Sequence, residues 1–276
     1  MKIIQSPREM QDWSLGCSQS IGFVCTMGAL HEGHLSLIRE ARKRCEKVVM
    51  SIFVNPLQFA PHEDFNAYPR TFESDVALCR AEGVDILFCP EVSALYPENF
   101  QTRVLGSELK KQYCGQTRPI FFDGVLTVVH MLFEIVRPQM GFWGEKDFQQ
   151  VFLVEQMVKD FWMPIEIIGM PIVREPSGLA LSSRNAYLSE AQKQEATCLF
   201  QAILAVQEAA LVGERSIQNL LGIARSKISL EIDYLELVSA KTLERLEGSL
   251  NGPARLLIAA YIGDNPKVRL IDNGNV

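Results

Sequence analysis

Two histidines three residues apart follow an apolar run and open a predicted helix. His31 and His34 come directly after the segment TMGAL at residues 26–30. In an open α/β sheet, ligands collect beyond the carboxyl ends of the strands, and the first turn of a helix offers N–H groups to anions. Gly28 permits backbone angles closed to other residues, and Gly33 allows close approach of a ligand. The pattern predicts a phosphate site.

The two imidazoles lie about one helical turn apart, so they share a helix face and can both donate hydrogen bonds to a polyphosphate. One of them would stabilise the oxygens that gain charge as pyrophosphate leaves. A surface cap or half of a metal site are the alternatives. Metal ligands on a helix more often lie four residues apart with a third ligand nearby, which favours the phosphate site.

Amide and ammonium side chains follow two further predicted strands. Asn55 and Gln58 present neutral amides that can bind hydroxyl or carboxylate groups, although Asn-Pro also suits an ordinary turn. Lys146 is a candidate phosphate contact at the start of a helix, and Gln150 is a second candidate amide for a substrate. A solvated Glu-Lys pair is the alternative at that helix start.

Two hydroxyls and a guanidinium form the last candidate group. Ser182, Ser183 and Arg184 follow Gly178 within a short segment. Such a loop can hold a triphosphate through charge-assisted hydrogen bonds, because guanidinium matches phosphate geometry. Ser-Ser-Arg would also suit a helix cap.

Composition excludes several classes of protein. The net charge of -6 comes without a basic run, which disfavours a polynucleotide partner. No stretch approaches the roughly 18 apolar residues of a membrane span, and the first residues lack the apolar run of a signal peptide, so we expect a cytoplasmic protein. The seven cysteines form no Cys-x-x-Cys pair, which indicates reduced, mostly buried thiols.

Apolar runs alternate with helix-period segments over the first 170 or so residues, which predicts an α/β fold with a parallel sheet. The predicted strands are 21–25, 48–54, 84–89, 140–143 and 165–169. The predicted helices are 35–45, 72–82, 125–136 and 148–161. Residues 90–119 read as an irregular surface excursion. We place this first domain at residues 1–174.

A smaller α+β domain is expected at residues 175–276. Its predicted helices are 189–212 and 217–228, and its predicted strands are 232–238, 255–262 and 268–271.

Together and in order, these segments resemble the pantothenate synthetases, the pantoate–β-alanine ligases of the HxGH nucleotidylyltransferase superfamily, which is related to class I aminoacyl-tRNA synthetases. The resemblance covers nearly the whole chain. The matching segments are 26–34 (TMGALHEGH), 51–59 (SIFVNPLQF), 68–71 (YPRT), 144–150 (GEKDFQQ), 178–185 (GLALSSRN) and 269–273 (RLIDN).

The resemblance implies an ATP-dependent ligase. Pantoate and ATP, with Mg²⁺, would give pantoyl adenylate and pyrophosphate, and β-alanine would then displace AMP to give pantothenate, a coenzyme A precursor. It also implies a Rossmann-like domain with helices on both faces of its sheet, a mobile C-terminal lid domain and a homodimer. No dedicated protein cage for the metal is implied, since Mg²⁺ would arrive with ATP.

The resemblance assigns roles residue by residue. The catalytic residues would be His34 as proton donor, His31, Lys146 and Arg184. Pantoate and β-alanine would contact Gln58, Gln150, Asn55 and Arg118, with Asn55 toward the magnesium and phosphates. The ATP site would comprise Met27, Gly28, Ala29, Leu30, His31, Glu32, Gly33, His34, Gly144, Glu145, Lys146, Asp147, Val173, Leu181, Ser182, Ser183 and Arg184.

The chain departs from the family pattern in two places. Where the family usually has RPGHFRG, residues 118–124 read RPIFFDG, so Phe121 replaces a histidine and Asp123 replaces a base. This change concerns the dimer-side wall of the predicted pocket. Cys25 stands where proline is common, which we expect to be harmless.

Most of the predicted site residues are hydrogen-bond donors, which suits the implied first step. The carboxylate of pantoate is already ionised at neutral pH and attacks without a general base. The ammonium group of β-alanine must lose a proton before it attacks, and water or the substrate phosphate are the candidate bases. The alternatives are an adenylyltransferase acting on a phosphate acceptor, a non-catalytic nucleotide sensor and a tRNA ligase. A phosphate acceptor would need an Arg- and Lys-rich pocket, whereas the amides at 55, 58 and 150 suit a small hydroxy acid.

Overall fold

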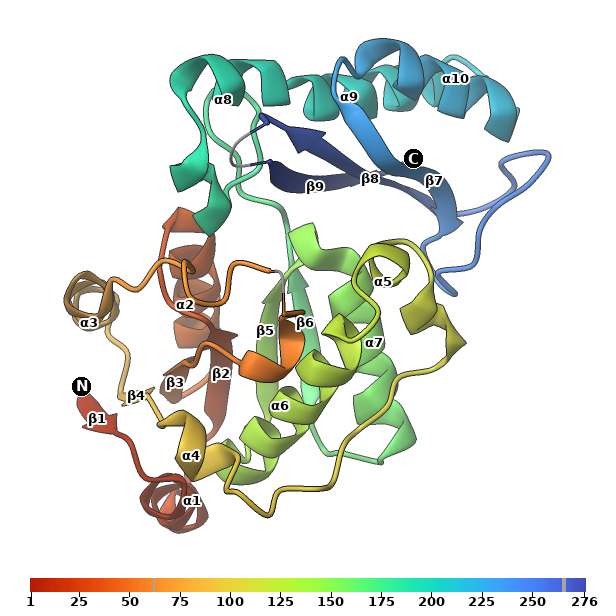
Figure 1. Cartoon of the computed structure of the whole chain (residues 1–276). Helices are drawn as coiled ribbons and strands as arrows, with labels where there is room; N and C mark the ends of the chain where they lie inside the picture. The colour runs from red at the N-terminus through yellow and green to blue at the C-terminus, as the bar shows by residue number, and fades with distance from the viewer. Residues whose placement is uncertain (62, 265–266) are drawn as a thin grey trace. The chain divides into compact units, whose positions relative to one another are not determined.

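The computed structural model describes residues 1–61, 63–264 and 267–276 (Figure 1). The backbone divides into two compact units. The first unit comprises Met1–Glu145 and Gln150–Pro171, and the second comprises Lys146–Gln149 and Ile172–Val276. The predicted domain limit at residue 174 stays a prediction. Within the described ranges, no helix is both long enough and apolar enough to cross a membrane.

A parallel sheet forms the centre of the first unit, as predicted. Across the described residues it has six strands in the order β1-β4-β3-β2-β5-β6. The predicted strands are present, and a short edge strand at the N-terminus was not predicted. The strands are β1 (Lys2–Ile4), β2 (Ile21–Thr26), β3 (Lys47–Ile52), β4 (Ile86–Phe88), β5 (Met140–Gly144) and β6 (Glu166–Met170).

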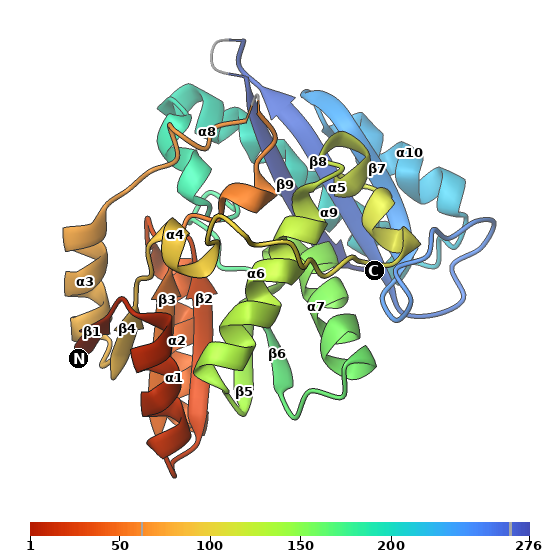
Figure 2. The ribbon, with the colours of Figure 1, turned by 60° about the horizontal axis from the view of Figure 1, so that its bottom comes forward.

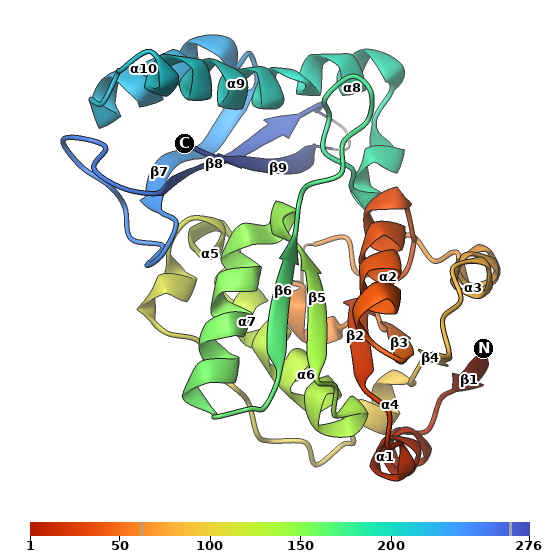
Figure 3. The same ribbon diagram turned by 180° about the vertical axis from the view of Figure 1, so that it is seen from behind.

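Helices cover both faces of this sheet, because successive strand residues point to opposite faces. On one face, where Figure 3 shows α2 (Glu32–Arg44) over the sheet, Val24 and Met50 pack with Ile38 of this helix. Cys79 of α3 (Phe72–Ala81) joins the same apolar cluster. On the other face, Phe23 contacts Phe133 of α6 (Phe121–Val136) with ring centroids 6.4 Å apart. Helix α1 (Pro7–Gly16) packs beside α6 there, and α7 (Phe148–Asp160) connects β5 to β6.

The strand order reverses direction between β2 and β5. From β2 the chain proceeds through α2 to β3 on one side, whereas from β5 it proceeds through α7 to β6 on the other. β2 and β5 are direct neighbours, with Gly22 opposite Met140 and Phe23 opposite Gly141. This is the topological switch point at which open α/β sheets bind ligands beyond the strand ends. The segments after Thr26 and Gly144 both start at this position.

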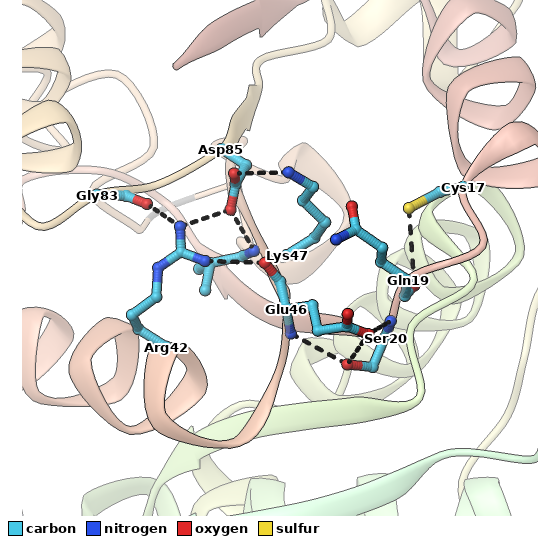
Figure 4. Close-up of polar contacts among 9 residues, drawn as sticks. Cys17, Gln19, Ser20, Arg42, Glu46, Lys47, Gly83 and Asp85 are labelled. Carbon is cyan, nitrogen blue, oxygen red and sulfur yellow. Dashed lines mark hydrogen bonds and ion pairs between the residues drawn. The ribbon is translucent and has the colours of Figure 1, made fainter.

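A polar network joins the opposite, amino-terminal ends of the strands (Figure 4). The carboxylate of Asp85 accepts hydrogen bonds from the Val48 N–H at 2.8 Å and the Arg42 guanidinium at 2.8 Å. The carboxylate of Glu46 accepts the Ser20 N–H at 3.1 Å, and the Glu46 N–H donates to the Ser20 hydroxyl at 3.0 Å. These bonds fix the register of β2, β3 and β4 at the edge remote from the switch point.

The excursion at residues 90–119 contains short helical turns. They are α4 (Val92–Leu95), η2 (Glu108–Lys111) and α5 (Cys114–Thr117), and a further turn, η1 (Pro56–Gln58), follows β3. Helix α6 begins at Phe121, four residues earlier than predicted, and includes Gly124. A Cβ at Gly124 would lie 2.3 Å from the Leu57 carbonyl oxygen, so glycine is required for α6 to pack against η1.

The second unit has an antiparallel sheet covered by helices on one face (Figure 2). Among the described residues the sheet has three strands in the order β7-β8-β9. Alternate residues of β8, including Leu256, Ile258 and Ala260, join a buried cluster with residues of α9 and α10. The predicted helix 189–212 is divided at Thr197. The elements are η4 (Ser183–Tyr187), α8 (Glu190–Ala196), α9 (Cys198–Leu211), α10 (Ile217–Lys227), β7 (Glu231–Ser239), β8 (Ala254–Ile262) and β9 (Val268–Asn275).

Candidate active site

The turn after β2 has a backbone conformation that the sequence could suggest only at its glycine. Gly28 has φ +84°, as its residue type predicted, and Ala29 also has a positive φ, +51°. A non-glycine residue in this region is strained unless surrounding contacts hold it. The Thr26 hydroxyl supplies one such contact, because it accepts the Gly28 N–H at 3.2 Å and donates to the Ser51 carbonyl at 2.9 Å.

Asp75 of α3 supplies the other contacts, and it is not among the site residues predicted from the sequence. Its carboxylate accepts the N–H of Ala29 at 3.0 Å and the N–H of Leu30 at 2.9 Å. The Thr71 hydroxyl donates to the same carboxylate at 3.0 Å. Asp75 is 1% exposed, so the strained turn is held by a buried anion from a helix 45 residues further along the chain. In sequence, an acid in the first turn of a helix is indistinguishable from an ordinary helix-dipole partner.

The two histidines lie against each other at the start of α2. Their ring centroids are 4.1 Å apart with an angle of 34° between the planes. His31 is the N-cap residue, and its N–H donates to Nδ1 of His34 at 3.3 Å. Since Nδ1 of a neutral His34 acts as an acceptor, its proton lies on Nε2, the nitrogen that can donate to a ligand. The N–H groups of Glu32 and Gly33 have no partner in the described part of the chain, and helix N-termini of this kind bind anions.

Gly33 makes room for the neighbouring imidazole. A Cβ at this position would lie 2.9 Å from Cε1 and 3.0 Å from Nδ1 of His31. From its residue type, Gly33 is predicted to allow close approach of a ligand. The structure gives a second reason, because any side chain here would displace the His31 ring.

Gly33→Ala is therefore expected to reduce kcat/KM roughly 10-fold or more while leaving the fold intact, because a displacement of about 1 Å at a positioned donor has large kinetic effects. Steady-state kinetics together with thermal unfolding would check it. The matched control is Gly16→Ala, where an added Cβ meets no atom within 4 Å. Unchanged kcat/KM in Gly33→Ala would contradict the importance of the His31 position.

Asn55 and Gln58 form a connected pair of amides beside the turn. Nδ2 of Asn55 donates to Oε1 of Gln58 and to the Gly124 carbonyl, each at 3.0 Å. Oδ1 of Asn55 accepts the Leu57 N–H at 3.2 Å and the Tyr96 hydroxyl at 2.8 Å. Desolvation raises the pKa of Tyr96, so its hydroxyl keeps the proton that it donates.

All four hydrogen-bonding positions of Asn55 are thus filled within the protein. Its predicted direct contact with a ligand stays a prediction, and this geometry favours a role in orienting Gln58. Nε2 of Gln58 lies 2.9 Å from Sδ of Met27, so the amides lie against the segment that leads into the histidine turn. The second N–H on Nε2 of Gln58 has no partner in the described ranges and can serve a ligand.

Arg118 also contacts this group. Its guanidinium pairs with the Glu63 carboxylate at 2.5 and 3.0 Å and donates to the Gln58 carbonyl at 3.1 Å. The guanidinium carbon lies 3.8 Å from the centroid of the Phe121 ring, within cation–π distance. Arg118 therefore fixes the backbone of Gln58, and its predicted contact with a substrate stays a prediction.

The departure at Asp123 is accommodated by a lysine on η2. Nζ of Lys110 lies 2.6 Å from both carboxylate oxygens of Asp123, and one of these oxygens also accepts the Gly106 N–H at 3.1 Å. An acid in the first turn of α6 also interacts favourably with the helix dipole. The acid at position 123 is therefore paired.

In the second unit, the segment 173–185 forms a hairpin and then a turn. The Leu181 N–H donates to the Val173 carbonyl at 3.0 Å, and Gly178 at the tip has φ +96°. The Ser182 hydroxyl accepts the Arg184 N–H at 3.3 Å and begins η4. The structure thus places two predicted ATP contacts, Val173 and Leu181, together at the hairpin base, directly before the predicted phosphate contacts.

Lys146 and Asp147 belong to this second unit, although they follow β5 of the first. They lie on η3 (Glu145–Asp147), and Nζ of Lys146 is 4.0 Å from the Asp147 carboxylate. Gly144, Glu145 and Gln150 belong to the first unit. In the described ranges, no group of three or more His, Cys, Asp or Glu side chains could hold a metal ion.

Comparison with known proteins identifies the family. A family model described as pantoate-beta-alanine ligase matches residues 2–275. The chain belongs to this family. Pantothenate synthetase from Trichlorobacter lovleyi is 49% identical over 280 residues, which cover 99% of this chain and 98% of that protein. The relative from Thermotoga petrophila is 45% identical, with 99% of each chain covered.

Solved structures of pantoate–β-alanine ligases have the same fold. A structure from Thermus thermophilus has a TM-score of 0.94 and 43% identity, and the match covers 99% of each chain. A structure from Francisella tularensis, described as complexed with beta-gamma ATP and beta-alanine, has a TM-score of 0.82 and 36% identity over 99% of this chain and 97% of that one. The family predicted from the sequence motifs is confirmed.

Proposed function

We propose that this chain catalyses the ATP-dependent condensation of pantoate with β-alanine to pantothenate. The observation that carries the proposal is the contact between Gln58 and Met27 at 2.9 Å. It joins an amide pair suited to a small hydroxy acid to the turn that carries the two histidines. The family match over residues 2–275 and the ATP- and β-alanine-bound relative support the same reaction.

The first step is adenylyl transfer. A carboxylate oxygen of pantoate attacks the α-phosphorus of ATP, the bond to the β-phosphate oxygen breaks, and pantoyl adenylate and pyrophosphate form. The nucleophile is already ionised, so the site needs only positioned donors. His31 and His34 Nε2 would donate to the phosphate oxygens that gain charge, and Lys146 and Arg184 would add positive charge along the triphosphate.

The second step is amide formation. The neutral amine of β-alanine attacks the acyl carbon of the adenylate, the carbon–oxygen bond to AMP breaks, and the nitrogen loses a proton. Gln58 and Gln150 would hold the pantoyl group during both steps. Asn55 and Arg118 would act through Gln58, because the first bonds its side chain and the second bonds its carbonyl.

Mg²⁺ belongs to the proposal as a partner of ATP. It prefers oxygen ligands, keeps several waters and usually binds through substrate phosphates with few protein ligands. Neutral donors such as His34 Nε2 and cations such as Lys146 suit the phosphate oxygens. The ion would neutralise charge on the triphosphate when bound.

Isotope exchange tests the two-step route. With ATP, Mg²⁺ and pantoate, and without β-alanine, the protein should transfer labelled pyrophosphate into ATP, because formation of the adenylate is reversible. Omitting pantoate should abolish the exchange. Exchange that needs β-alanine, or that proceeds without pantoate, would contradict a pantoyl-adenylate intermediate.

Restoring the family's histidine at position 121 tests the pocket wall. Phe121 lies under the Arg118 guanidinium, which in turn bonds the Gln58 carbonyl, so Phe121→His is expected to change KM for pantoate more than kcat. Steady-state kinetics with varied pantoate would check it, with Phe122→Leu as a control for packing at the same helix start. A large gain in kcat would instead mean that Phe121 weakens the chemical step.

We also propose, from the family resemblance, that the protein is a cytoplasmic homodimer. Sedimentation of the purified chain at micromolar concentration would test the dimer, and a single monomeric species would contradict it.

A further inference from the structure

The motif RLIDN at residues 269–273 has no part in the site described above. It lies on β9, where Asp272 pairs with Ile258 and Asn273 with Leu257 of the central strand β8. The side chains of these two adjacent motif residues bind two different segments of the second unit. Both segments carry residues assigned to ATP.

Asp272 binds the hairpin through Arg174. Its two oxygens accept hydrogen bonds from the Arg174 guanidinium at 2.6 and 2.8 Å, and Asp272 is 4% exposed. The same guanidinium donates to the Gly178 carbonyl at 3.0 Å and lies 4.0 Å from the centroid of the Phe200 ring. A bidentate, buried pair of this kind fixes orientation as well as distance. The hairpin that leads into Ser182 is therefore fastened to β9.

Asn273 binds the second segment directly. Its Nδ2 donates to the Lys146 carbonyl at 2.9 Å. The next residues are held to the same sheet, because the Arg255 guanidinium of β8 lies 4.0 Å from the centroid of the Phe148 ring. The backbone N–H of Asn273 also donates to the Asp272 carboxylate at 2.8 Å, which helps to fix that carboxylate.

We propose that Asp272 and Asn273 are positioning residues that hold Lys146 and the segment Ser182–Arg184 on one scaffold. This inference rests on the proposed function, which assigns both segments to the triphosphate. Because both segments are fastened to adjacent residues of one strand, that strand sets the separation between them. Lys146 and Arg184 thus reach the phosphates together.

A double-mutant cycle tests the link to Lys146, because residues that act through one another have non-additive effects. Asn273→Ala is expected to lower the rate of pantoate-dependent pyrophosphate exchange about 10-fold, with an unchanged thermal midpoint. In the Lys146→Ala background the same change should have less than about a 2-fold effect. A double variant whose loss equals the product of the two single losses would overturn the proposal, as would a wild-type rate for Asn273→Ala.

The second cycle tests the link through Arg174. Arg174→Lys keeps the buried charge pair but removes the bidentate fork, so it should fold and slow exchange about 10-fold. Its effect should vanish in the Arg184→Ala background. Additive losses in this cycle would overturn the assignment for Asp272.

Asp233→Asn is the matched control. It removes another ion pair of the same sheet, in which Asp233 of β7 binds Arg269 near the start of β9 at 2.7 and 2.9 Å. Its effect should be below about 2-fold and additive with Lys146→Ala. Non-additivity here would mean that loosening the sheet alone accounts for the result and would overturn the positioning role.

Failure of the proposed function and failure of the positioning role would give different results. A wild-type protein without pantoate-dependent exchange would contradict the proposed function. In that case the same variants would be compared by their affinity for ATP with Mg²⁺, measured by calorimetry. Non-additive losses of affinity would support the positioning role for a nucleotide, and additive losses would overturn it.

Discussion

Replacing His34 by alanine is expected to lower kcat roughly 100-fold or more, in line with the loss of one preorganised donor to the transition state. The acceptor role of its Nδ1 toward the His31 N–H directs the proton of Nε2 to the ligand. The loss should appear in kcat more than in KM for ATP, because the charge on the leaving oxygens develops only in the transition state. Single-turnover formation of pyrophosphate would measure it.

Two further variants serve as controls for His34→Ala. His34→Asn keeps an amide oxygen to accept the His31 N–H and an N–H to donate, so it should retain more activity than His34→Ala. His130→Ala is the matched control, since this α6 histidine packs on Phe161 with ring centroids 5.5 Å apart and has no assigned role. A kcat for His34→Ala within a few-fold of wild type would remove His34 from the proposed step.

Asp75→Asn is expected to weaken both the fold and ATP binding. The carboxylate now accepts the N–H groups of Ala29 and Leu30. The amide nitrogen of asparagine is a donor, so it would face one of these N–H groups and leave it without an acceptor. A buried donor left without a partner costs about 1–3 kcal/mol, so unfolding in urea should show a loss of this size. Because Ala29 has a positive φ, release of the turn should also raise KM for ATP, roughly 10-fold or more.

Glu73→Gln provides the control for Asp75. Glu73 lies in the first turn of the same helix and is exposed, so its neutralisation should change stability by less than about 0.5 kcal/mol and leave KM for ATP unchanged. If Asp75→Asn matched this control in both measurements, the carboxylate would not be what holds the turn.

Short-range patterns predicted most of the elements and the position of the candidate site. Strand endings, the glycine at 28 and the His-x-Gly-His spacing are local signals, and they led to the carboxyl edge of the sheet. Helix α2 begins at Glu32, three residues before the predicted start, because His31 and His34 cap it although histidine is not a typical cap residue. β1 was missed because three residues at a sheet edge carry too little periodicity.

Long-range contacts set the limits of prediction for the site. Asp75 reaches back to Leu30, and Asp272 reaches Arg174 across 98 residues, and neither link leaves a periodic trace in the sequence. The predicted helix began at residue 125, whereas α6 begins at Phe121 and includes Gly124, against which the Leu57 carbonyl packs. Asn55 and Arg118 were predicted to contact the substrate directly. Their polar groups bind other protein groups around Gln58, which favours a role in orienting that residue.

The most direct test of the central claim is product formation by the purified protein. Given ATP, Mg²⁺, pantoate and β-alanine, it should release AMP, pyrophosphate and pantothenate in equal amounts. Without β-alanine, pyrophosphate release should stop at about one equivalent per site and no AMP should be released, because the adenylate remains bound. The absence of β-alanine-dependent AMP and pantothenate would contradict the account, as would transfer of AMP to a phosphate acceptor in place of pantoate.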